Sequence, residues 1–367
     1  MLNIGTLLNK YSNELGGNNV FNYTVLLVNN LAEAGKYNEA IAILKDIIKQ
    51  AGNSLPKEII TSFNVMISLY EFNNNHFPAK HYTDNIIPEY RFAMEHAGIS
   101  FEVMVNNRKM KALLDTGCSS NVISKDLADK IGISKYMTDT ILTNSSIKTL
   151  KGMIDSVEIN NIKIYNYPVD VLLEKPNLSI SKELEQGLFN YIDSVNNYDL
   201  LIGIPTLKLL GSVNIDFIEK KIVFGQVEPV RQQPSNLLLI DNLLYLNVKL
   251  NKQPFTAIYD TGYSVGTFLN REYYDKHKQY FKLKEEKQYQ INTYMAHGLD
   301  TLDYKMLDDI ILSIPKKDLR IKNIMVSVNK PISYQGYPTP DGIIGTNFFN
   351  SLKRMRLDFD NMYMYFE

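Results

Sequence analysis

The chain has 367 residues, of which 45% are hydrophobic and 22% are charged, a composition typical of a globular protein and not of a disordered or fibrous one. Its 39 Lys and Arg residues nearly balance its 40 Asp and Glu residues, so no basic excess indicates a nucleic-acid partner. The length predicts two or three compact units, because a single hydrophobic core rarely grows to this size.

Cys118 is the only cysteine in the sequence, which excludes an intrachain disulfide and a structural zinc site built on several cysteines. The most apolar stretch of the second half, residues 237–246, is interrupted by Asp241 and Asn242 before it could span a bilayer. We therefore expect no membrane partner. Residues 1–17 lack the basic start and unbroken apolar run of a secretory signal. A cytoplasmic location is expected for the chain as given, and an exported or periplasmic one if a signal segment was removed.

The N-terminal region is predicted to be helical from residue 4 to about Gly98. Apolar residues recur there at three- and four-residue spacings, with good helix formers between them. Gly35, Gly52 and Pro56 would divide the region into short paired helices. We assign residues 1–97 to a helical domain.

One stretch of this region, residues 31–56 with the sequence LAEAGKYNEAIAILKDIIKQAGNSLP, resembles a tetratricopeptide-type helical hairpin. Residues 67–88 are interpreted as a second, degenerate unit. Repeats of this type often bind peptides or partner proteins, so a protein partner at the helical domain is one prediction. The alternative is a helical cap that only packs on the rest of the fold.

After Gly98, short alternating or β-branched runs separated by Asn, Gly and Pro predict many short strands. This part contains two similar stretches. The first reads FEVMVNNRKMKALLDTGCSSNVIS and later YDLLIGIPTLKLLGSVNIDFIEKKIVF, and the second reads YLNVKLNKQPFTAIYDTGYSVGTFLN and later PDGIIGTNFFNSLKRMRLDFDNMYMYF. We assign residues 98–228 to a first lobe and residues 236–367 to a second, with a linker near residues 226–235.

Three landmarks recur in the same order in both stretches. Asp115 and Asp260 each begin an Asp-Thr-Gly triplet, and they are 145 residues apart. Asp199 and Asp341 begin the segments Asp-Leu-Leu-Ile-Gly and Asp-Gly-Ile-Ile-Gly, which are 142 residues apart. The third landmark is Ile215-Asp216-Phe217 in one copy and Leu357-Asp358-Phe359 in the other. Several matches at nearly one spacing are hard to obtain by chance, so an internal duplication is predicted.

Each triplet follows an apolar run, so its acid is expected where a buried strand turns. Gly117 and Gly262 would allow the tight turn. The hydroxyls of Thr116 and Thr261 could hydrogen-bond the backbone of the opposite loop across a pseudo-twofold axis. Two carboxylates brought together in this way cannot both ionise easily, so one keeps a proton. Such a pair supplies a general base for water and a general acid for a carbonyl, without a covalent intermediate.

With these motifs, each copy resembles one lobe of the retropepsin-like aspartic proteases, and their fusion resembles the two-lobed pepsin arrangement over about two-thirds of the chain. The resemblance implies a mainly β fold of two pseudo-symmetric acid-protease barrel lobes behind the helical domain. It implies an aspartic endopeptidase that hydrolyses peptide bonds with water activated between Asp115 and Asp260. No cofactor or metal is expected, the substrate is a peptide or protein, and a monomer suffices because each lobe supplies one acid. The supporting residues are Thr116, Gly117, Thr261 and Gly262.

The same resemblance implies that Leu201-Ile202-Gly203 and Ile343-Ile344-Gly345 pass beneath the catalytic loops, where the small Gly allows close approach. It also implies a flap over the cleft. Residues 143–152 and 292–298 are the candidates, with Tyr294 as a flap aromatic, and ordinary hairpin loops are the alternative reading.

The chain departs from the family's pattern directly after each triplet. Cys118 and Tyr263 stand where pepsin-like enzymes usually carry Ser or Thr and retropepsins carry Ala. Loss of those hydroxyls should stabilise the anionic form less and move the working pH upward from strong acid. The bulky Tyr263 counts against full activity. Cys118 is interpreted as a packing residue, because no second cysteine or paired base accompanies it.

Other functions remain open at this level. The five histidines are scattered, so a Ser-His or Cys-His hydrolase is a weaker hypothesis. A non-catalytic peptide-binding protein on the same fold has no need of two intact Asp-Thr-Gly triplets. A scaffold protein acting through its helical repeats would be unaffected by loss of either Asp.

Overall fold

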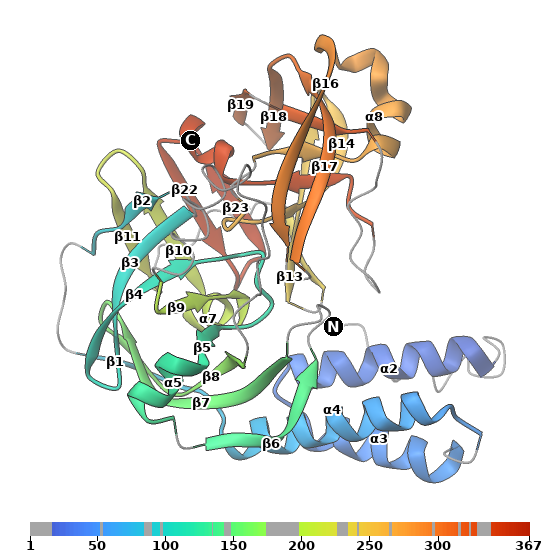
Figure 1. The fold of residues 1–367 in the computed structure, drawn as a ribbon, viewed down its shortest axis with the longest axis vertical. Coiled ribbons are helices and arrows are strands. Elements are labelled where there is room, and N and C mark those ends of the chain that lie inside the picture. Colours follow the sequence, from blue (N-terminus) through green and yellow to red (C-terminus); the bar gives the residue numbers. More distant parts are fainter. Residues whose placement is uncertain are drawn as a thin grey trace.

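The computed structural model describes residues 17–51, 54–83, 90–95, 98–133, 135–142, 148–173, 198–225, 234–240, 242–263, 266–295, 298–314, 317–322, 324–328 and 339–367. The fold of these residues is mainly β, as predicted. Figure 1 shows the N-terminal helices at the bottom right, the strands that follow them at the lower left, and the orange strands of the second half at the top right. No helix in the described part of the chain is both long and apolar enough to cross a membrane.

The N-terminal helices are α2 (Gly17–Glu33), α3 (Tyr37–Ala51) and α4 (Lys57–Asn75). Gly35, with φ of +73°, makes the turn between α2 and α3, a backbone conformation that glycine adopts without strain. The helices bury an apolar cluster of their own that includes Val28, Leu44, Phe63 and Ile67.

The helical pattern predicted up to Gly98 ends earlier, at Asn75. Strand β1 (Ala79–Tyr82) follows and pairs antiparallel with β8 (Ile162–Leu172), and β2 (Ala93–Glu95) pairs with β3 (Gly98–Val105). The second helical unit predicted for residues 67–88 is therefore wrong. Pairing with the edge of a distant strand decides the conformation here over local helix propensity.

The first sheet has the strand order β1-β8-β5-β9-β4-β3-β7-β6, and β7 also pairs with β8. This extra pairing closes β3, β4, β9, β5, β8 and β7 into a barrel. Its remaining strands and helices are β4 (Arg108–Leu114), β5 (Val122–Ser124), α5 (Lys125–Ile131), β6 (Lys135–Leu142), β7 (Lys148–Ile159), β9 (Leu200–Ile202) and α7 (Ile204–Leu210).

The second sheet has the order β16-β17-β20-β15-β21-β14-β13-β18-β19, with β12 paired to β13. Its elements are β12 (Leu237–Ile240), β13 (Leu243–Leu250), β14 (Gln253–Tyr259), β15 (Phe268–Leu269), α8 (Arg271–His277), η1 (Lys278–Tyr280), β16 (Leu283–Met295), β17 (Gly298–Leu307), β18 (Ile310–Ile314), β19 (Lys317–Ile321), β20 (Ile324–Ser327), β21 (Gly342–Ile344) and η2 (Thr346–Ser351).

The pairings around the triplets correspond between the sheets. Strand β4 runs parallel to β9 as β14 runs parallel to β21. Strand β5 runs antiparallel to β9 and parallel to β8, as β15 runs antiparallel to β21 and parallel to β20. Strands β3 and β13 also share one pattern, four buried residues followed by alternation, which places one strand face in the core.

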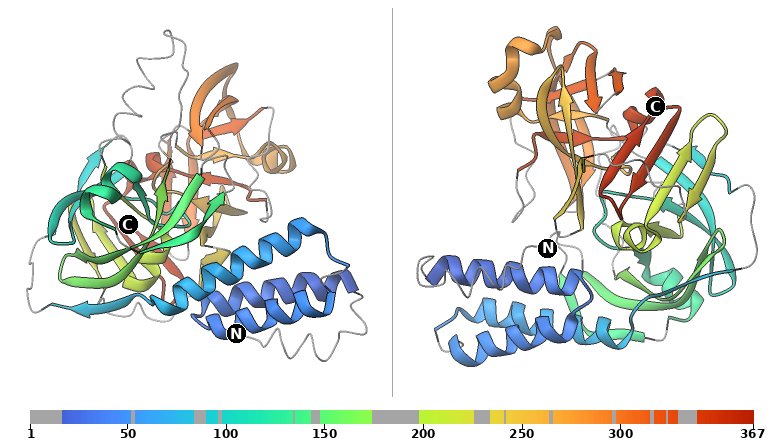
Figure 2. Two further views of the ribbon diagram at one scale, coloured as in Figure 1. Left: turned by 60° about the horizontal axis from the view of Figure 1, so that its bottom comes forward. Right: turned by 180° about the vertical axis from the view of Figure 1, so that it is seen from behind.

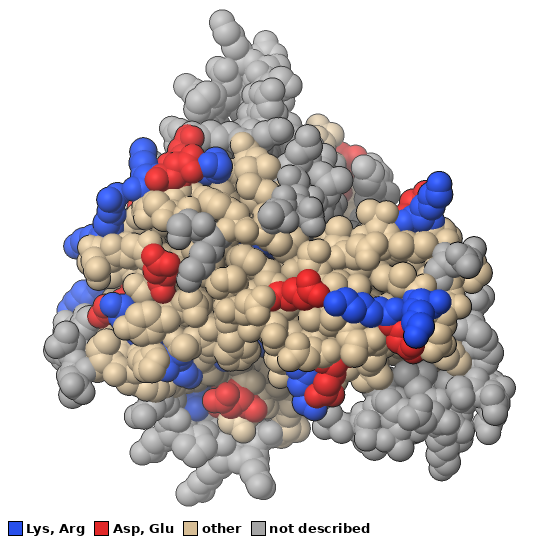
Figure 3. Space-filling view, turned by 90° about the horizontal axis from the view of Figure 1, so that it is seen from below, with Lys and Arg blue, Asp and Glu red and all other residues tan. Residues whose placement is uncertain are grey.

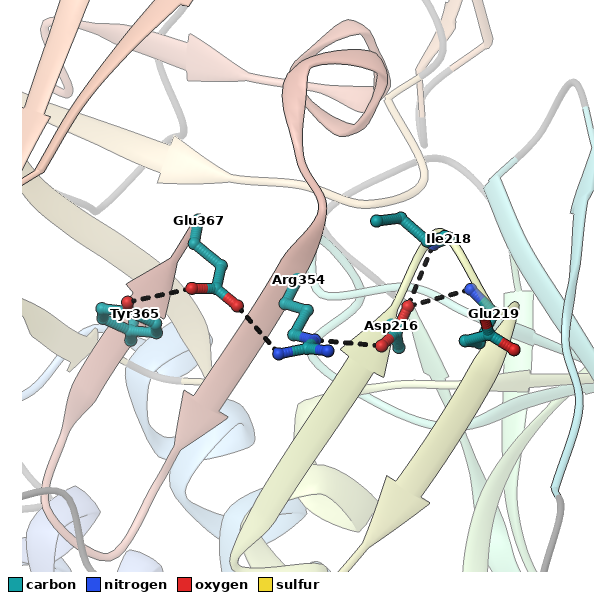
Figure 4. Close-up of polar contacts among 6 residues, drawn as sticks. All are labelled: Asp216, Ile218, Glu219, Arg354, Tyr365 and Glu367. Carbon is teal, nitrogen blue, oxygen red and sulfur yellow. Dashed lines mark hydrogen bonds and ion pairs between the residues drawn. The ribbon is translucent and has the colours of Figure 1, made fainter.

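A joining sheet with the order β11-β10-β22-β23 links the two halves of the chain, and Figure 2 shows its red strands beside the yellow-green ones. It consists of β10 (Ser212–Asp216), β11 (Lys221–Phe224), β22 (Arg354–Asp358) and β23 (Tyr363–Phe366). Arg354 bridges the halves, because its Nε donates to Asp216 at 3.0 Å. Its Nη1 also donates to Glu367 of its own half at 3.2 Å (Figure 4). Asp216 also accepts from the backbone N–H groups of Glu219 and Ile218, which with Arg354 hold its pKa below the usual range.

A buried ion pair in the joining sheet is expected to matter more for stability than this exposed one. Asp358 is 3% exposed, accepts from Arg356 Nη2 at 3.0 Å and accepts from the Asn361 N–H at 3.0 Å. Asp358→Ala should lower the free energy of unfolding by about 3 kcal/mol, since it leaves a buried cation without this carboxylate. Glu367→Gln, at an exposed pair, should change it by less than about 1 kcal/mol. Urea denaturation of both variants checks this, and equal losses would contradict it.

Candidate active site

The Asp-Thr-Gly triplets lie at the ends of β4 and β14, as predicted for a buried strand that turns. The N–H of Asp115 donates to the carbonyl of Ile202 at 3.0 Å, and the N–H of Asp260 donates to that of Ile344 at 3.0 Å. Each apolar-apolar-Gly segment thus runs directly beside a triplet loop. A Cβ on Gly203 would lie 2.2 Å from a backbone oxygen of the first loop. Only glycine permits this approach, which confirms the role predicted for it.

The threonines of the triplets hold the loops together by reciprocal hydrogen bonds. Thr116 Oγ1 donates to the carbonyl of Tyr259 at 2.7 Å and accepts from the N–H of Thr261 at 3.0 Å. Thr261 Oγ1 donates to the carbonyl of Leu114 at 2.8 Å and accepts from the N–H of Thr116 at 2.9 Å. Both threonines are fully buried. The expected bonding of each hydroxyl to the opposite loop is therefore present.

The carboxyl groups of Asp115 and Asp260 face each other across this contact. Each accepts from its own triplet's glycine N–H, at 2.9 Å from Gly117 and 2.8 Å from Gly262. A Cβ on Gly117 would lie 2.2 Å from Asp260 Cγ, and one on Gly262 would lie 2.7 Å from Asp115 Cγ. The structure thus brings together two acids that are 145 residues apart in the sequence.

This surrounding raises the pKa of both acids. Burial is the main cause for each, and the negative charge of Asp115 raises the pKa of Asp260 further. The glycine N–H groups act in the opposite direction but are outweighed. The pair therefore keeps one proton at a pH where an isolated aspartate has lost it.

The raised pKa of Asp260 predicts a pH-dependent cost to stability. In the folded state Asp260 keeps a proton that the unfolded chain releases above about pH 4. The contribution of Asp260 to the free energy of unfolding therefore falls as the pH rises from about 4 to the pKa of the folded state. Asp260→Asn has no such charge. The variant should unfold with a free energy at least about 1 kcal/mol higher than wild type at pH 7, with no gain at pH 3. Thermal melts at both values test this, and an equal difference at both would contradict it.

Tyr263 lies in the core and not between the carboxyls. Its side chain is 6% exposed and belongs to an apolar cluster with Tyr245, Ile258 and Phe268. Its carbonyl accepts from the N–H of Thr346 at 3.0 Å. The bulk of this side chain is therefore accommodated in the core.

Cys118 lies beside the first acid with a neutral thiol. Burial raises the pKa of the thiol to about 12, and the negative charge of Asp115 adds to the shift. A thiolate is the reactive form, so Cys118 is a poor nucleophile at neutral pH. Cys118→Ala should keep peptide hydrolysis within about threefold of wild type. Rate measurements on the folded variant check this, and complete loss of hydrolysis would indicate a thiol role.

The flap candidates are only partly described. Strands β6 and β7 pair up to Leu142 and Lys148, and β16 and β17 pair up to Met295 and Gly298. Both candidates thus belong to antiparallel hairpins. The tips at residues 143–147 and 296–297 and the side chain of Tyr294 lie outside the described part of the chain. So does most of the predicted linker, residues 226–233.

Sequence reasoning missed a buried asparagine that supports the first loop. Asn121 Oδ1 accepts from the N–H of Gly203 at 3.0 Å and from Thr206 Oγ1 at 2.8 Å, and its Nδ2 donates to the carbonyl of Pro168 at 2.9 Å. In the second half the equivalent position is Thr267, whose carbonyl accepts from the N–H of Met325 as that of Asn121 accepts from the N–H of Asp170. The second copy therefore has no asparagine at this position, so the internal repeat gave no signal for Asn121.

No group of three or more His, Cys, Asp or Glu side chains within the described ranges could hold a metal ion. The chemistry that these residues offer is acid–base chemistry by two carboxyls sharing a proton. A carboxylate of this kind can accept a proton from water while its partner donates one.

Part of the chain is similar in sequence to known proteases. Residues 101–189 match the family described as aspartyl protease. No curated protein matches the sequence significantly. Among solved structures, a retropepsin-like aspartic protease from Rickettsia conorii is 19% identical, covers 40% of this chain and 90% of its own, and has a TM-score of 0.25. The family match includes Asp115 and its whole triplet, and this similarity supports a protease function for the chain.

Proposed function

We propose that the chain is an aspartic endopeptidase in which Asp115 and Asp260 form one catalytic pair. The observation that carries this is the reciprocal bonding of Thr116 and Thr261, which sets the two carboxyls face to face. The raised pKa values give the second requirement, one proton shared by two acids. Catalysis by a single chain follows, since both acids come from the same molecule.

In the proposed reaction, the ionised carboxylate takes a proton from a water molecule placed between the acids. The water oxygen attacks the carbonyl carbon of the scissile peptide, while the protonated carboxyl gives its proton to the carbonyl oxygen. A tetrahedral gem-diol intermediate results. The carboxyl that took the water proton then gives it to the amide nitrogen, while the other carboxylate takes a proton from one gem-diol hydroxyl. The C–N bond breaks, a carboxylic acid and an amine leave, and one proton remains on the pair as at the start. No covalent enzyme intermediate forms.

The proposal includes two duplicated lobes, residues 98–228 and 236–367, behind a helical domain assigned to residues 1–97. The corresponding pairings of β4, β5, β8 and β9 with those of β14, β15, β20 and β21 support the duplication. The identical hydrogen bonding of two acids, one in each lobe, also supports the duplication. Asp199 Oδ2 accepts from the N–H of Lys111 at 2.8 Å, and Asp341 Oδ2 accepts from that of Thr256 at 2.8 Å. Strands β1 and β2 fall within the first assigned range but join the first sheet.

Mass spectrometry of a proteome-derived peptide library incubated with the protein over a range of pH tests the proposal. New termini should appear at defined bonds, and a statine-type transition-state analogue should suppress them. Folded protein that retains peptides but produces no new termini at any pH would instead favour the binding-module hypothesis.

A further inference from the structure

A cavity of about 670 Å³ lies between the N-terminal helices and the first sheet. One wall is formed by α2 and α4, with Asn29, Leu69 and Asn73 among its residues. The other is formed by the first sheet and the loop after the first triplet, with Ser119 and Ser120. Figure 2 shows the blue helices beside the green strands of that sheet. The volume falls in the range of about 300 to 1,000 Å³ that is typical of ligand sites.

This cavity is continuous with the candidate catalytic loop. Ser119 and Ser120 follow Asp115 by four and five residues, in the same loop. Asn121 also lines the cavity and fixes the loop to Gly203 and Thr206. Neither Asp115 nor Asp260 is among the lining residues, so the cavity adjoins the catalytic pair through this loop and does not contain it.

The helical wall is attached to the sheet at a defined position. Helix α4 leads into β1, which pairs with β8 from Ala79 to Tyr82. Lys80 Nζ also donates to the carbonyl of Leu209, a cavity residue, at 2.7 Å. On the sheet side Lys151 and Asp170 form a partly buried ion pair in the lining. Because both walls are anchored, the cavity can select ligands by shape.

The lining combines large apolar side chains with short polar ones. Tyr37, Leu69 and Val169 offer apolar contact, while Asn73 and Ser119 can hydrogen-bond backbone amides. The face drawn in Figure 3 carries Lys and Arg interspersed with Asp and Glu, and wide uncharged areas lie between them. Charges of both signs also occur in the lining, where Lys151 pairs with Asp170.

We propose that this cavity is a substrate-recognition site, in which the helices bind a large apolar side chain of the polypeptide several residues away from the bond to be cleaved. This inference rests on the proposed function. It gives the N-terminal helices a role in selecting the substrate, through contact with the peptide and not with a separate partner protein.

The test is a bulky substitution on the helical wall. Asn73→Trp would fill the cavity from α4, whereas Asn74→Trp, at the next and exposed position outside the lining, is the matched control. Both variants and wild type are incubated with the proteome-derived peptide library, and cleaved positions are read by mass spectrometry. KM and kcat are then measured for the best-cleaved peptide and for a version shortened to remove the residue distant from the cleaved bond.

Wild type and Asn74→Trp should prefer a large apolar residue at one position distant from the cleaved bond. Asn73→Trp should lose this preference and show a KM at least about tenfold higher for the long peptide with kcat nearly unchanged. All three should cleave the shortened peptide alike. An unchanged preference in folded Asn73→Trp would overturn the inference. Asn73→Met, a smaller filling residue, replaces it if the Trp variant does not fold.

A peptide-binding experiment distinguishes a failure of this inference from a failure of the proposed function. The protein with both Asp115→Asn and Asp260→Asn should bind peptides without cleaving them. The library peptides that it retains are compared with those retained by the same protein carrying Asn73→Trp in addition. Loss of retention with Asn73→Trp but not with Asn74→Trp supports the cavity even if wild type hydrolyses nothing, in which case only the proposed function fails. Retention that is insensitive to Asn73→Trp overturns the cavity proposal, whatever the hydrolysis result.

Discussion

Replacing either Asp115 or Asp260 by Asn should reduce peptide turnover by a factor on the order of 10³ or more. Each carboxyl lies against the glycine of the opposite triplet, so the two acids occupy one site and each is expected to have its own part in the proton transfers. An Asn amide can neither accept a proton from water nor donate one to a carbonyl oxygen at a useful rate. Initial rates on a peptide identified from the library measure the loss.

Asp155→Asn is the matched control for these substitutions. Asp155 is an exposed acid on β7 in the first sheet, and its replacement should leave turnover nearly unchanged. Melting curves confirm that each variant is folded. A folded Asp115→Asn or Asp260→Asn protein with a tenth or more of wild-type activity would rule out the shared-proton mechanism.

Thr116→Val should lower the free energy of unfolding by about 2 to 5 kcal/mol and remove most activity. Valine keeps the shape of the side chain but loses the hydroxyl that donates to Tyr259 O and accepts from the Thr261 N–H. Those backbone groups then lack these partners at a buried position. The carboxyls depend on the same contact for their relative position, so activity should fall together with stability.

Two further variants show whether the hydroxyl itself is responsible. Thr116→Ser keeps it and should retain most of the stability. Thr256→Val removes a hydroxyl that donates to Asn247 Oδ1 at 2.8 Å at an exposed position, and should cost less than about 1 kcal/mol. Urea denaturation of the three proteins gives the comparison. A loss in Thr116→Val no larger than in Thr256→Val would contradict the role given to the interlocked threonines.

The site was predictable because its parts recur. The triplets and the Asp-Leu-Leu-Ile-Gly and Asp-Gly-Ile-Ile-Gly segments share one order and nearly one spacing, and corresponding segments of duplicated folds meet across an axis. Hydrogen bonding of Thr116 and Thr261 to the opposite loop followed from that symmetry. These motifs are short sequence segments, so they can be recognised without knowing how the chain packs.

Features that depend on distant contacts were not predictable. Residues 79–82, AKHY, have no alternating apolar pattern, and they form β1 because the edge of β8 is available to pair. The burial of Tyr263 depends on packing against Tyr245, Ile258 and Phe268, which are distant in the sequence or carry no local signal of this contact. The cavity joins residues from α2, α4 and the first sheet, and no single segment of the sequence contains it.

The measurement that tests the central claim most directly is a double-mutant cycle on turnover with wild type, Asp115→Asn, Asp260→Asn and the double variant. If the two acids act as one unit with one shared proton, the double variant should be no more than a few-fold slower than either single variant, because the first substitution already removes the function. Losses that multiply, so that the double variant falls by the product of the two single effects, would show independent roles and contradict a shared catalytic pair.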